Sequence, residues 1–197
     1  MDPQLRAALT IGYERLSAWS DLLDQINVFP VADADTGRNL MISLAPLHRS
    51  GAPTETILRR LLVSATGNSG NIAACFFAGF VAENPSKDLH RAIKIGSERA
   101  WQAIADPKPG TILTIFDTLL TTIQSAPVEA LTALYPSLID RLEESVHSTA
   151  ETLPELKVAG VVDAGALGMF IFMEGFFSCL AGGENGFRPI TETFRYK

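Results

Sequence analysis

The chain has 197 residues, a net charge of -6 at pH 7, 47% hydrophobic residues and 19% charged residues. These values are typical of a globular protein and suffice for one well-buried domain. They exclude a nucleic-acid partner, which needs clustered lysines and arginines, and no apolar run reaches the roughly 20 residues of a membrane span.

Apolar residues recur at helical spacing from residue 5 onward, and no alternating stretch is long enough for a convincing strand. A first helix is predicted over 5–26. The later helices are expected over approximately 37–48, 54–62, 67–80, 89–104, 111–123, 127–153 and 167–180. Short connections favour an all-α, antiparallel bundle or barrel of eight helices, with residues 3–181 as one domain. Residues 182–197 are expected to be an irregular tail or the start of a linker.

The two cysteines, Cys75 and Cys179, each lie inside an apolar run. Neither has the spacing of a zinc site or of a disulfide framework. We expect both to be reduced and buried, and the N-terminus lacks the pattern of a secretory signal. These features favour a cytoplasmic location.

The most informative segment is 27–39, which reads Asn-Val-Phe-Pro-Val-Ala-Asp-Ala-Asp-Thr-Gly-Arg-Asn. Its two carboxylates, Asp33 and Asp35, stand one residue apart on backbone that is not expected to be helical. Such a pair can bind one Mg²⁺ ion, which leaves its other positions to water and phosphate oxygens. The helix predicted to begin at Gly37 would add free N–H groups that favour an anion.

The same residues allow a simpler interpretation, in which the segment is an acidic turn and Asp35 caps the following helix. The apolar residues around it, including Val28, Phe29 and Val31, favour a packed loop that holds the carboxylates in place. Asn27 is either a further ligand or a brace for the loop. The residues alone leave both alternatives open.

Three later loops also carry residues suited to a ligand: Gly67-Asn68-Ser69-Gly70, Pro109-Gly110-Thr111 and Asp163-Ala164-Gly165. Glycines allow the backbone to approach a phosphate closely, and each loop precedes a predicted helix. Each signal is weak alone, since the first is a common turn and Asp163 is a good N-cap. Together, loops at one end of a bundle predict one ligand site, with Arg38 and Lys108 as possible helpers.

These four motifs, in this order, resemble the nucleotide-binding domain of bacterial fatty acid kinase, a relative of the nucleotide-binding subunit of dihydroxyacetone kinase. The resemblance covers about residues 3–181. It implies a barrel of eight helices that binds ATP or ADP at one end, with two Mg²⁺ ions. It also implies that Asp33 and Asp35 bind magnesium, with Asn27 nearest to the position of a third aspartate in the dihydroxyacetone kinase branch.

The resemblance also assigns the remaining site residues. Thr36, Gly37, Arg38 and Asn39 match a phosphate-contacting segment, and the other nucleotide contacts would be Asn68, Ser69, Gly110, Thr111, Asp163 and Gly165. Thr66 departs from the pattern, because fatty acid kinases usually have a basic residue there.

Fatty acid kinases carry further domains and phosphorylate an acyl chain that a separate lipid-binding protein holds. The resemblance therefore implies a kinase domain that is inactive without its acceptor-binding partner, a DegV-like protein or fused domain. Two rival functions are a nucleotide sensor without catalysis and a kinase for a small substrate like dihydroxyacetone. A purely structural helical bundle is the third alternative. The sequence leaves open a homodimer, and whether the chain is a whole protein or one domain.

Overall fold

The computed structural model describes residues 1–48, 51–123, 130–183 and 186–194. Within them the chain is helical, with no strand, as the sequence predicts. Eight helices have eleven or more residues: α1 (Pro3–Ala18), α3 (Thr36–His48), α4 (Thr54–Ser64), α5 (Gly67–Ala82), α6 (Leu89–Trp101), α7 (Ile112–Thr122), α8 (Leu131–Thr152) and α10 (Ala164–Leu180). Three are shorter: α2 (Ser20–Gln25), α9 (Pro154–Ala159) and α11 (Ile190–Thr193).

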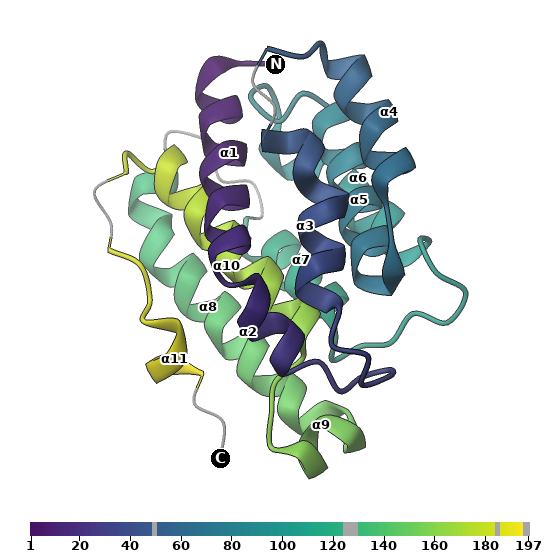
Figure 1. Ribbon diagram of the computed structural model, residues 1–197. Helices are drawn as coiled ribbons and strands as arrows, with labels where there is room; N and C mark the ends of the chain where they lie inside the picture. Colours follow the sequence, from purple (N-terminus) through teal and green to yellow (C-terminus); the bar gives the residue numbers. More distant parts are fainter. Residues whose placement is uncertain (49–50, 124–129, 184–185, 195–197) are drawn as a thin grey trace.

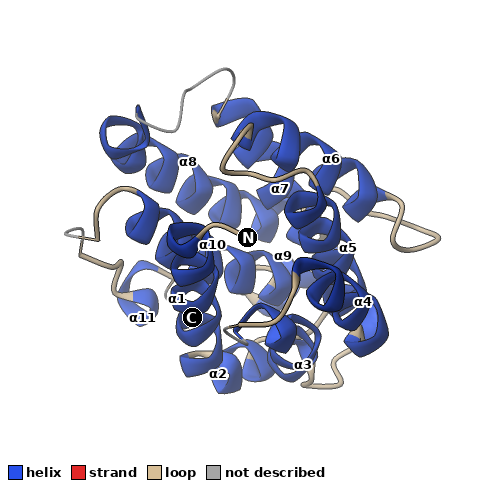
Figure 2. Ribbon diagram, turned by 90° about the horizontal axis from the view of Figure 1, so that it is seen from above, coloured by secondary structure: helices blue, strands red, loops and turns tan. Residues whose placement is uncertain are grey.

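Helix α10 is the central element of the bundle (Figures 1 and 2). It packs against α1, α7 and α8, and every residue from Ala164 to Ser178 is buried. The core around it is rich in phenylalanine rings, and Phe76 on α5 stacks on Phe116 on α7 with ring centroids 3.9 Å apart. Burial on all sides explains why the α10 sequence is apolar throughout instead of striped.

The helix predicted over 5–26 is divided in two at Trp19. The Trp19 N–H bonds to the carbonyl of Leu16, and α2 begins at Ser20. No glycine or proline marks this break, so helical spacing alone does not reveal it. The break matters for the site because α2 packs closely against α3. A Cβ on Gly37 would lie 2.1 Å from the carbonyl oxygen of Ser20.

Other boundaries differ from the prediction at the second half of the chain. The expected helix start at Pro127 lies outside the described residues, and α8 is described from Leu131. After α8, the separate helix α9 ends at Gly160 in the left-handed conformation (φ 67°), where glycine is favoured. Helix α10 starts at Ala164, one residue after Asp163, instead of at Leu167.

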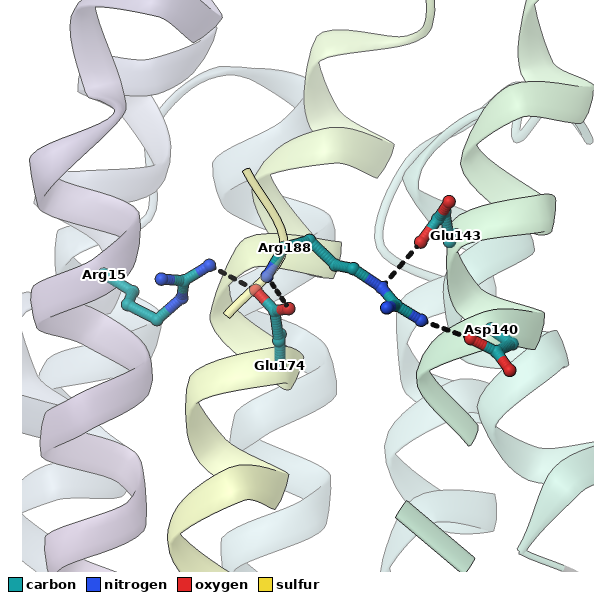
Figure 3. Close-up of polar contacts among 5 residues, drawn as sticks. All are labelled: Arg15, Asp140, Glu143, Glu174 and Arg188. Carbon is teal, nitrogen blue, oxygen red and sulfur yellow. Dashed lines mark hydrogen bonds and ion pairs between the residues drawn. The ribbon is translucent and has the colours of Figure 1, made fainter. Parts of the chain in front are cut away.

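The C-terminal segment, expected to be irregular, contains the single turn α11 and packs on the bundle. Ile190 and Phe194 are buried. In Figure 3, Glu174 on α10 is approached from opposite sides: the Arg15 guanidinium donates to one of its oxygens, and the Arg188 backbone N–H donates to the other over 2.7 Å.

The Arg188 guanidinium then pairs with Asp140 and Glu143 on α8. These ion pairs and the buried aromatic ring of the tail tie residues 186–194 to α8 and α10. Burial raises the pKa of Glu174, and the hydrogen bond from Arg188 and the charge of Arg15 oppose that shift.

Within the described residues, no helix combines the length and the apolar character needed to cross a membrane. The two cysteines are free, and both are half-buried instead of buried as expected. Burial still raises the pKa of each thiol.

Candidate functional site

A cavity of about 210 Å³ lies where three inter-helix connections meet the start of α5. Its walls come from the segments before α3, α7 and α10 and from the first two turns of α5, and these regions carry the four sequence motifs. The lining residues are Phe29, Pro30, Asn68, Ser69, Ile72, Ile104, Asp106, Lys108, Thr111, Ile112 and Asp163. Four of the predicted site residues, from three different loops, therefore share one cavity.

The first wall is the loop that contains the two aspartates. Asp33 is exposed and Asp35 is half-buried. The buried side chain of Asn27 donates from Nδ2 to Oδ1 of Asp33 over 2.7 Å. This contact is the one that the bracing alternative for Asn27 predicts. The loop is less packed than expected, because Val31 is 62% exposed.

The backbone between the two aspartates has an unusual conformation. Ala34 has a φ of 54°, in the left-handed region that residues with a Cβ rarely occupy. Such a conformation costs of the order of 1 kcal/mol and persists only where the surroundings impose it. The aspartate pair therefore occupies a specific, strained turn instead of a relaxed surface loop.

Helix α3 is capped by a residue that the sequence analysis did not select. Asp24, on α2, accepts through Oδ1 from the N–H groups of Gly37 (2.7 Å) and Arg38 (3.2 Å). These are the two donors that Asp35 would satisfy if it were the N-cap. Among the described residues, the Asp35 carboxylate has no hydrogen bond or ion pair. Asp35 therefore does not cap α3, because the two amides that it would accept from donate to Asp24 instead.

The same contacts change what α3 offers to a phosphate. The Gly37 and Arg38 amides are already occupied, so a phosphate can use them only if Asp24 moves. Gly37 itself is needed for the close approach of α2. Thr36 is buried and Arg38 is exposed.

The second motif forms the first turn of α5 instead of a separate loop. Gly67 has a φ of 64°, and a Cβ there would lie 2.3 Å from Nδ2 of Asn39. The side chain of Asn39, in the first motif, therefore lies against the second motif. Asn68 and Ser69 follow and line the cavity.

The third motif lies at the N-terminus of α7. Gly110 has a φ of 81° and donates its N–H to Oγ1 of Thr114 over 2.8 Å. The hydroxyl of Thr111 donates to the carbonyl of Lys108 over 2.7 Å. Thr111 lines the cavity, whereas Gly110 does not.

An ion pair that the sequence did not predict lies beside that motif. Lys108 pairs with Asp106 at 2.9 Å, and both residues line the cavity. Lys108 was named as a possible helper from the sequence, but Asp106 was not selected at all. The only sequence signal for it is its place in the proline-containing loop before α7.

Asp163 is the buried polar centre of the site. Its Oδ2 accepts from the Ala166 N–H over 2.7 Å, which confirms that it caps α10. It also accepts hydrogen bonds from the Ile112 and Gly165 amides, so one carboxylate joins the starts of α7 and α10. Burial raises the pKa of Asp163 to about 6, against the opposing effect of these three N–H donors.

Two further contacts fix the fourth motif. The Asp163 N–H donates to Oγ1 of Thr149 on α8 over 2.9 Å. A Cβ on Gly165 would lie 3.0 Å from Oγ of Ser69, so the fourth motif touches the second. Asp163 consequently caps α10 and also lines the cavity, so its role as an N-cap does not exclude a contact with a ligand.

The predicted site residues thus form two neighbouring groups. Asn68, Ser69, Thr111 and Asp163 line the cavity, with Gly110 and Gly165 in the supporting backbone. Asn27, Asp33, Asp35, Thr36, Gly37, Arg38 and Asn39 do not line it; they belong to the loop that contributes Phe29 and Pro30, and to the start of α3. Within the described residues, no three acidic, histidine or cysteine side chains are close enough to form a metal cluster.

The structure is an all-α domain with a cavity lined by residues of inter-helix loops and of the first two turns of α5. Residues 30–178 match the family model of the DAK2 domain, and the chain belongs to that family. The match includes both aspartates and the three later motifs.

Curated relatives match most of this chain. The chain is 34% identical to protein YloV of Bacillus subtilis over 188 residues, which is 87% of this chain and 34% of that protein. It is 34% identical to an uncharacterized protein of Staphylococcus saprophyticus over 200 residues, 92% of this chain and 36% of that protein. The chain therefore spans about a third of these relatives.

The fold matches the dihydroxyacetone kinase of C. freundii, crystallised in complex with AMP-PNP and Mg²⁺. The TM-score is 0.69 at 20% identity, over 93% of this chain and 34% of that chain. The native form of the same enzyme gives a TM-score of 0.60. At this identity the match establishes the fold.

Proposed function

We propose that this chain is the nucleotide-binding domain of a kinase, which binds ATP or ADP with Mg²⁺ and transfers the γ-phosphoryl group. The observation that carries the proposal is the capping of α3 by Asp24. Because Asp24 bonds to the helix amides, the Asp35 carboxylate remains available for a cation beside the cavity. Asp33 accepts from Asn27 through Oδ1 only, and its Oδ2 has no hydrogen-bond donor among the described residues.

The donor set suits Mg²⁺. Two carboxylates and the amide oxygen of Asn27 are hard oxygen ligands, and Mg²⁺ usually takes one or two protein carboxylates and fills its other positions with water and phosphate oxygens. The bound ions, two by the resemblance to fatty acid kinase, would neutralise negative charge on the phosphates. Asp33 and Asp35 would be the ligands, and Asn27 a further ligand or a brace.

The cavity suits the remainder of a nucleotide. Phe29, Ile72 and Ile104 offer apolar surface to a flat base, whereas Asn68, Ser69 and Thr111 offer hydrogen bonds. Lys108 supplies a positive charge at the cavity for a phosphate once it leaves Asp106. These residues would bind and orient the nucleotide, and orientation with charge stabilisation accounts for most catalysis of phosphoryl transfer.

For the acceptor we propose a fatty acyl carboxylate, presented by a separate or fused DegV-like lipid-binding protein, in a cytoplasmic setting. This choice rests on the sequence resemblance to fatty acid kinase. A carboxylate acceptor is already ionised and needs no general base, which fits a site where no base is assigned. A sensor without catalysis and a kinase for a dihydroxyacetone-like substrate are the alternatives that turnover experiments separate.

Calorimetry with ADP, in the presence and absence of Mg²⁺, tests the proposed function. We expect binding that needs Mg²⁺ and that is lost in the double variant Asp33→Asn, Asp35→Asn. The matched control is Glu98→Gln with Glu155→Gln, which makes the same change of charge at two exposed positions on α6 and α9.

Equal affinity of the aspartate variant and the wild type would contradict the magnesium assignment. Absence of ADP binding to the wild type would contradict the nucleotide site itself. ATP turnover in the presence of a lipid-loaded DegV-like protein, and not with dihydroxyacetone, would favour the fatty acid kinase assignment over the alternatives.

A further inference from the structure

A hollow beside helices α1, α3 and α4 is separate from the proposed nucleotide site. It is a groove of about 480 Å³, lined by Tyr13, Met41, Ile42, Ala45, Pro46, Arg60, Val63 and Ser64. The three helices lie side by side (Figure 1). None of the groove residues belongs to the cavity formed by the four loops.

Apolar side chains are unusually exposed along this groove. Two of its apolar lining residues are strongly exposed: Ile42 on α3 (45%) and Val63 on α4 (81%). Scattered apolar residues need no explanation, but two on adjacent helices that line one groove indicate a binding surface.

On two of the three helices around the groove, α3 and α4, the charged residues are mostly positive, although the whole chain is acidic; α1 adds Glu14, which pairs with His48 on α3. Helices α3 and α4 carry three arginines and a single acidic residue, Glu55. Arg38, Arg59 and Arg60 are exposed, and none of them has an ion-pair partner among the described residues. Arg38 precedes Ile42 by one helical turn, and Arg59 precedes Val63 by one turn, so the charges and apolar groups share a face.

The groove therefore combines an apolar lining with the charge of Arg60, and Arg38 and Arg59 stand one helical turn from its lining residues Ile42 and Val63. We propose that it docks an amphipathic, acidic helix of a partner protein. A groove between two helices accepts the apolar face of a third, and glutamates or aspartates beside that face would pair with the arginines. The concave shape favours a helix over the flat surface of a membrane.

The groove extends toward the end of the bundle that carries the proposed nucleotide site. Helix α3 begins directly after Asp35, and α4 ends three residues before Gly67. Arg38, Arg60 and Val63 consequently lie toward the end of the bundle that carries the four loops. A partner bound here would stand beside the proposed nucleotide site. The docking inference itself goes beyond the proposed function and does not depend on phosphoryl transfer.

Fluorescence anisotropy with synthetic peptides tests the inference on the full chain. One labelled helical peptide carries leucines on one face and glutamates beside them, and the second carries lysines in place of the glutamates. We expect the glutamate peptide to bind about tenfold more tightly, the difference that a few solvent-exposed charge pairs supply, and to weaken as salt is raised.

Paired variants locate the binding. Val63→Ser combined with Ile42→Ser should lower the affinity for the glutamate peptide about tenfold, as expected for lost burial of two apolar side chains. Val158→Ser is the control: Val158 is also exposed (91%) but lies outside the groove, so this change should leave the affinity unaltered. Arg59→Glu with Arg60→Glu should reverse the preference between the two peptides. The matched control, Lys94→Glu with Arg141→Glu, changes the net charge equally on other faces and should leave the preference unchanged.

Equal binding of both peptides, no binding of either, or no effect of the groove variants would overturn the inference. Two other occupants would also overturn it. Self-association in sedimentation experiments that Val63→Ser abolishes would identify a second copy of the chain, and binding to anionic vesicles lost in the same variant would identify a membrane. Mg²⁺–ADP affinity, measured in parallel, shows whether each variant retains the proposed nucleotide site, so the two proposals fail separately.

Discussion

The buried side-chain amide of Asn27 donates a hydrogen bond of 2.7 Å to the carboxylate of the exposed Asp33. One residue thus connects the end of α2 with the aspartate pair, across the apolar part of the loop. This contact restricts Asp33 before any ligand binds, and preorganisation of this kind reduces the cost of binding.

The Asn27 contact can be tested as a brace. Asn27→Ala should lower Mg²⁺-dependent ADP affinity by about tenfold, the value of one lost hydrogen bond, and by less than Asp33→Asn does. Asn27→Asp distinguishes a brace from a ligand. As a brace, it should weaken binding because two carboxylates then repel each other, and stronger Mg²⁺ binding in calorimetry would identify position 27 as a ligand.

The cap that Asp24 provides for α3 should be visible in the stability of the chain. Asp24→Ala should lower the free energy of unfolding by about 1 kcal/mol, whereas Asp24→Asn should retain most of it, because asparagine is an equally good cap. Urea denaturation measures both. A loss of the same size in both variants would show that the negative charge of Asp24, and not its capping bonds, stabilises the helix.

Ala34 provides a test of the strained turn between the aspartates. Ala34→Gly should raise the free energy of unfolding by up to about 1 kcal/mol, since glycine occupies the left-handed region without steric cost. Ala34→Val should lower it, because a β-branched side chain is least compatible with positive φ. Thermal unfolding followed by circular dichroism ranks the three proteins, and a valine variant as stable as the glycine variant would contradict the assigned backbone conformation.

The raised pKa of Asp163 predicts a pH dependence of stability. The folded chain holds the proton of Asp163 up to about pH 6, whereas the unfolded chain releases it near pH 3.8. Between these values the folded state binds more protons, so stability is highest at the acidic side and falls as pH rises. The shift of about two units corresponds to a loss of about 3 kcal/mol.

Asp163→Asn cannot ionise and should not show that loss. The variant should therefore gain stability relative to the wild type by about 3 kcal/mol between pH 4 and pH 7. Denaturation at several pH values measures this difference. A difference that stays constant across the range would mean that Asp163 is ionised in the folded chain at pH 4.

Helical spacing predicts the fold class well because burial against a common core imposes that spacing on each long helix. It does not predict the break at Trp19, where neither glycine nor proline interrupts the pattern. The break separates α2, which carries Asp24, and the capping of α3 by Asp24 joins residues thirteen positions apart. Such contacts depend on how helices pack against each other, so they cannot be predicted from the local sequence.

In the candidate site too, some residues could be predicted from the sequence and others could not. Asn68, Ser69, Thr111 and Asp163 could be selected from the sequence, since glycine loops before helices have few other purposes when four occur in order. Asp106 could not, because an aspartate in a loop with prolines is usually a solvated surface residue. Glu174 was also missed as a polar centre, since its partner Arg188 lies in a segment expected to be irregular.

The four motifs are proposed to form one metal and nucleotide site. Nuclear magnetic resonance with Mn²⁺ in place of Mg²⁺ tests it most directly, because the paramagnetic ion broadens the amide signals of nearby residues. With ADP present, we predict broadening at Ala34, Ser69, Thr111 and Gly165, and none at Ser86 in the loop between α5 and α6. Broadening confined to other segments, or equal along the chain, would contradict the account.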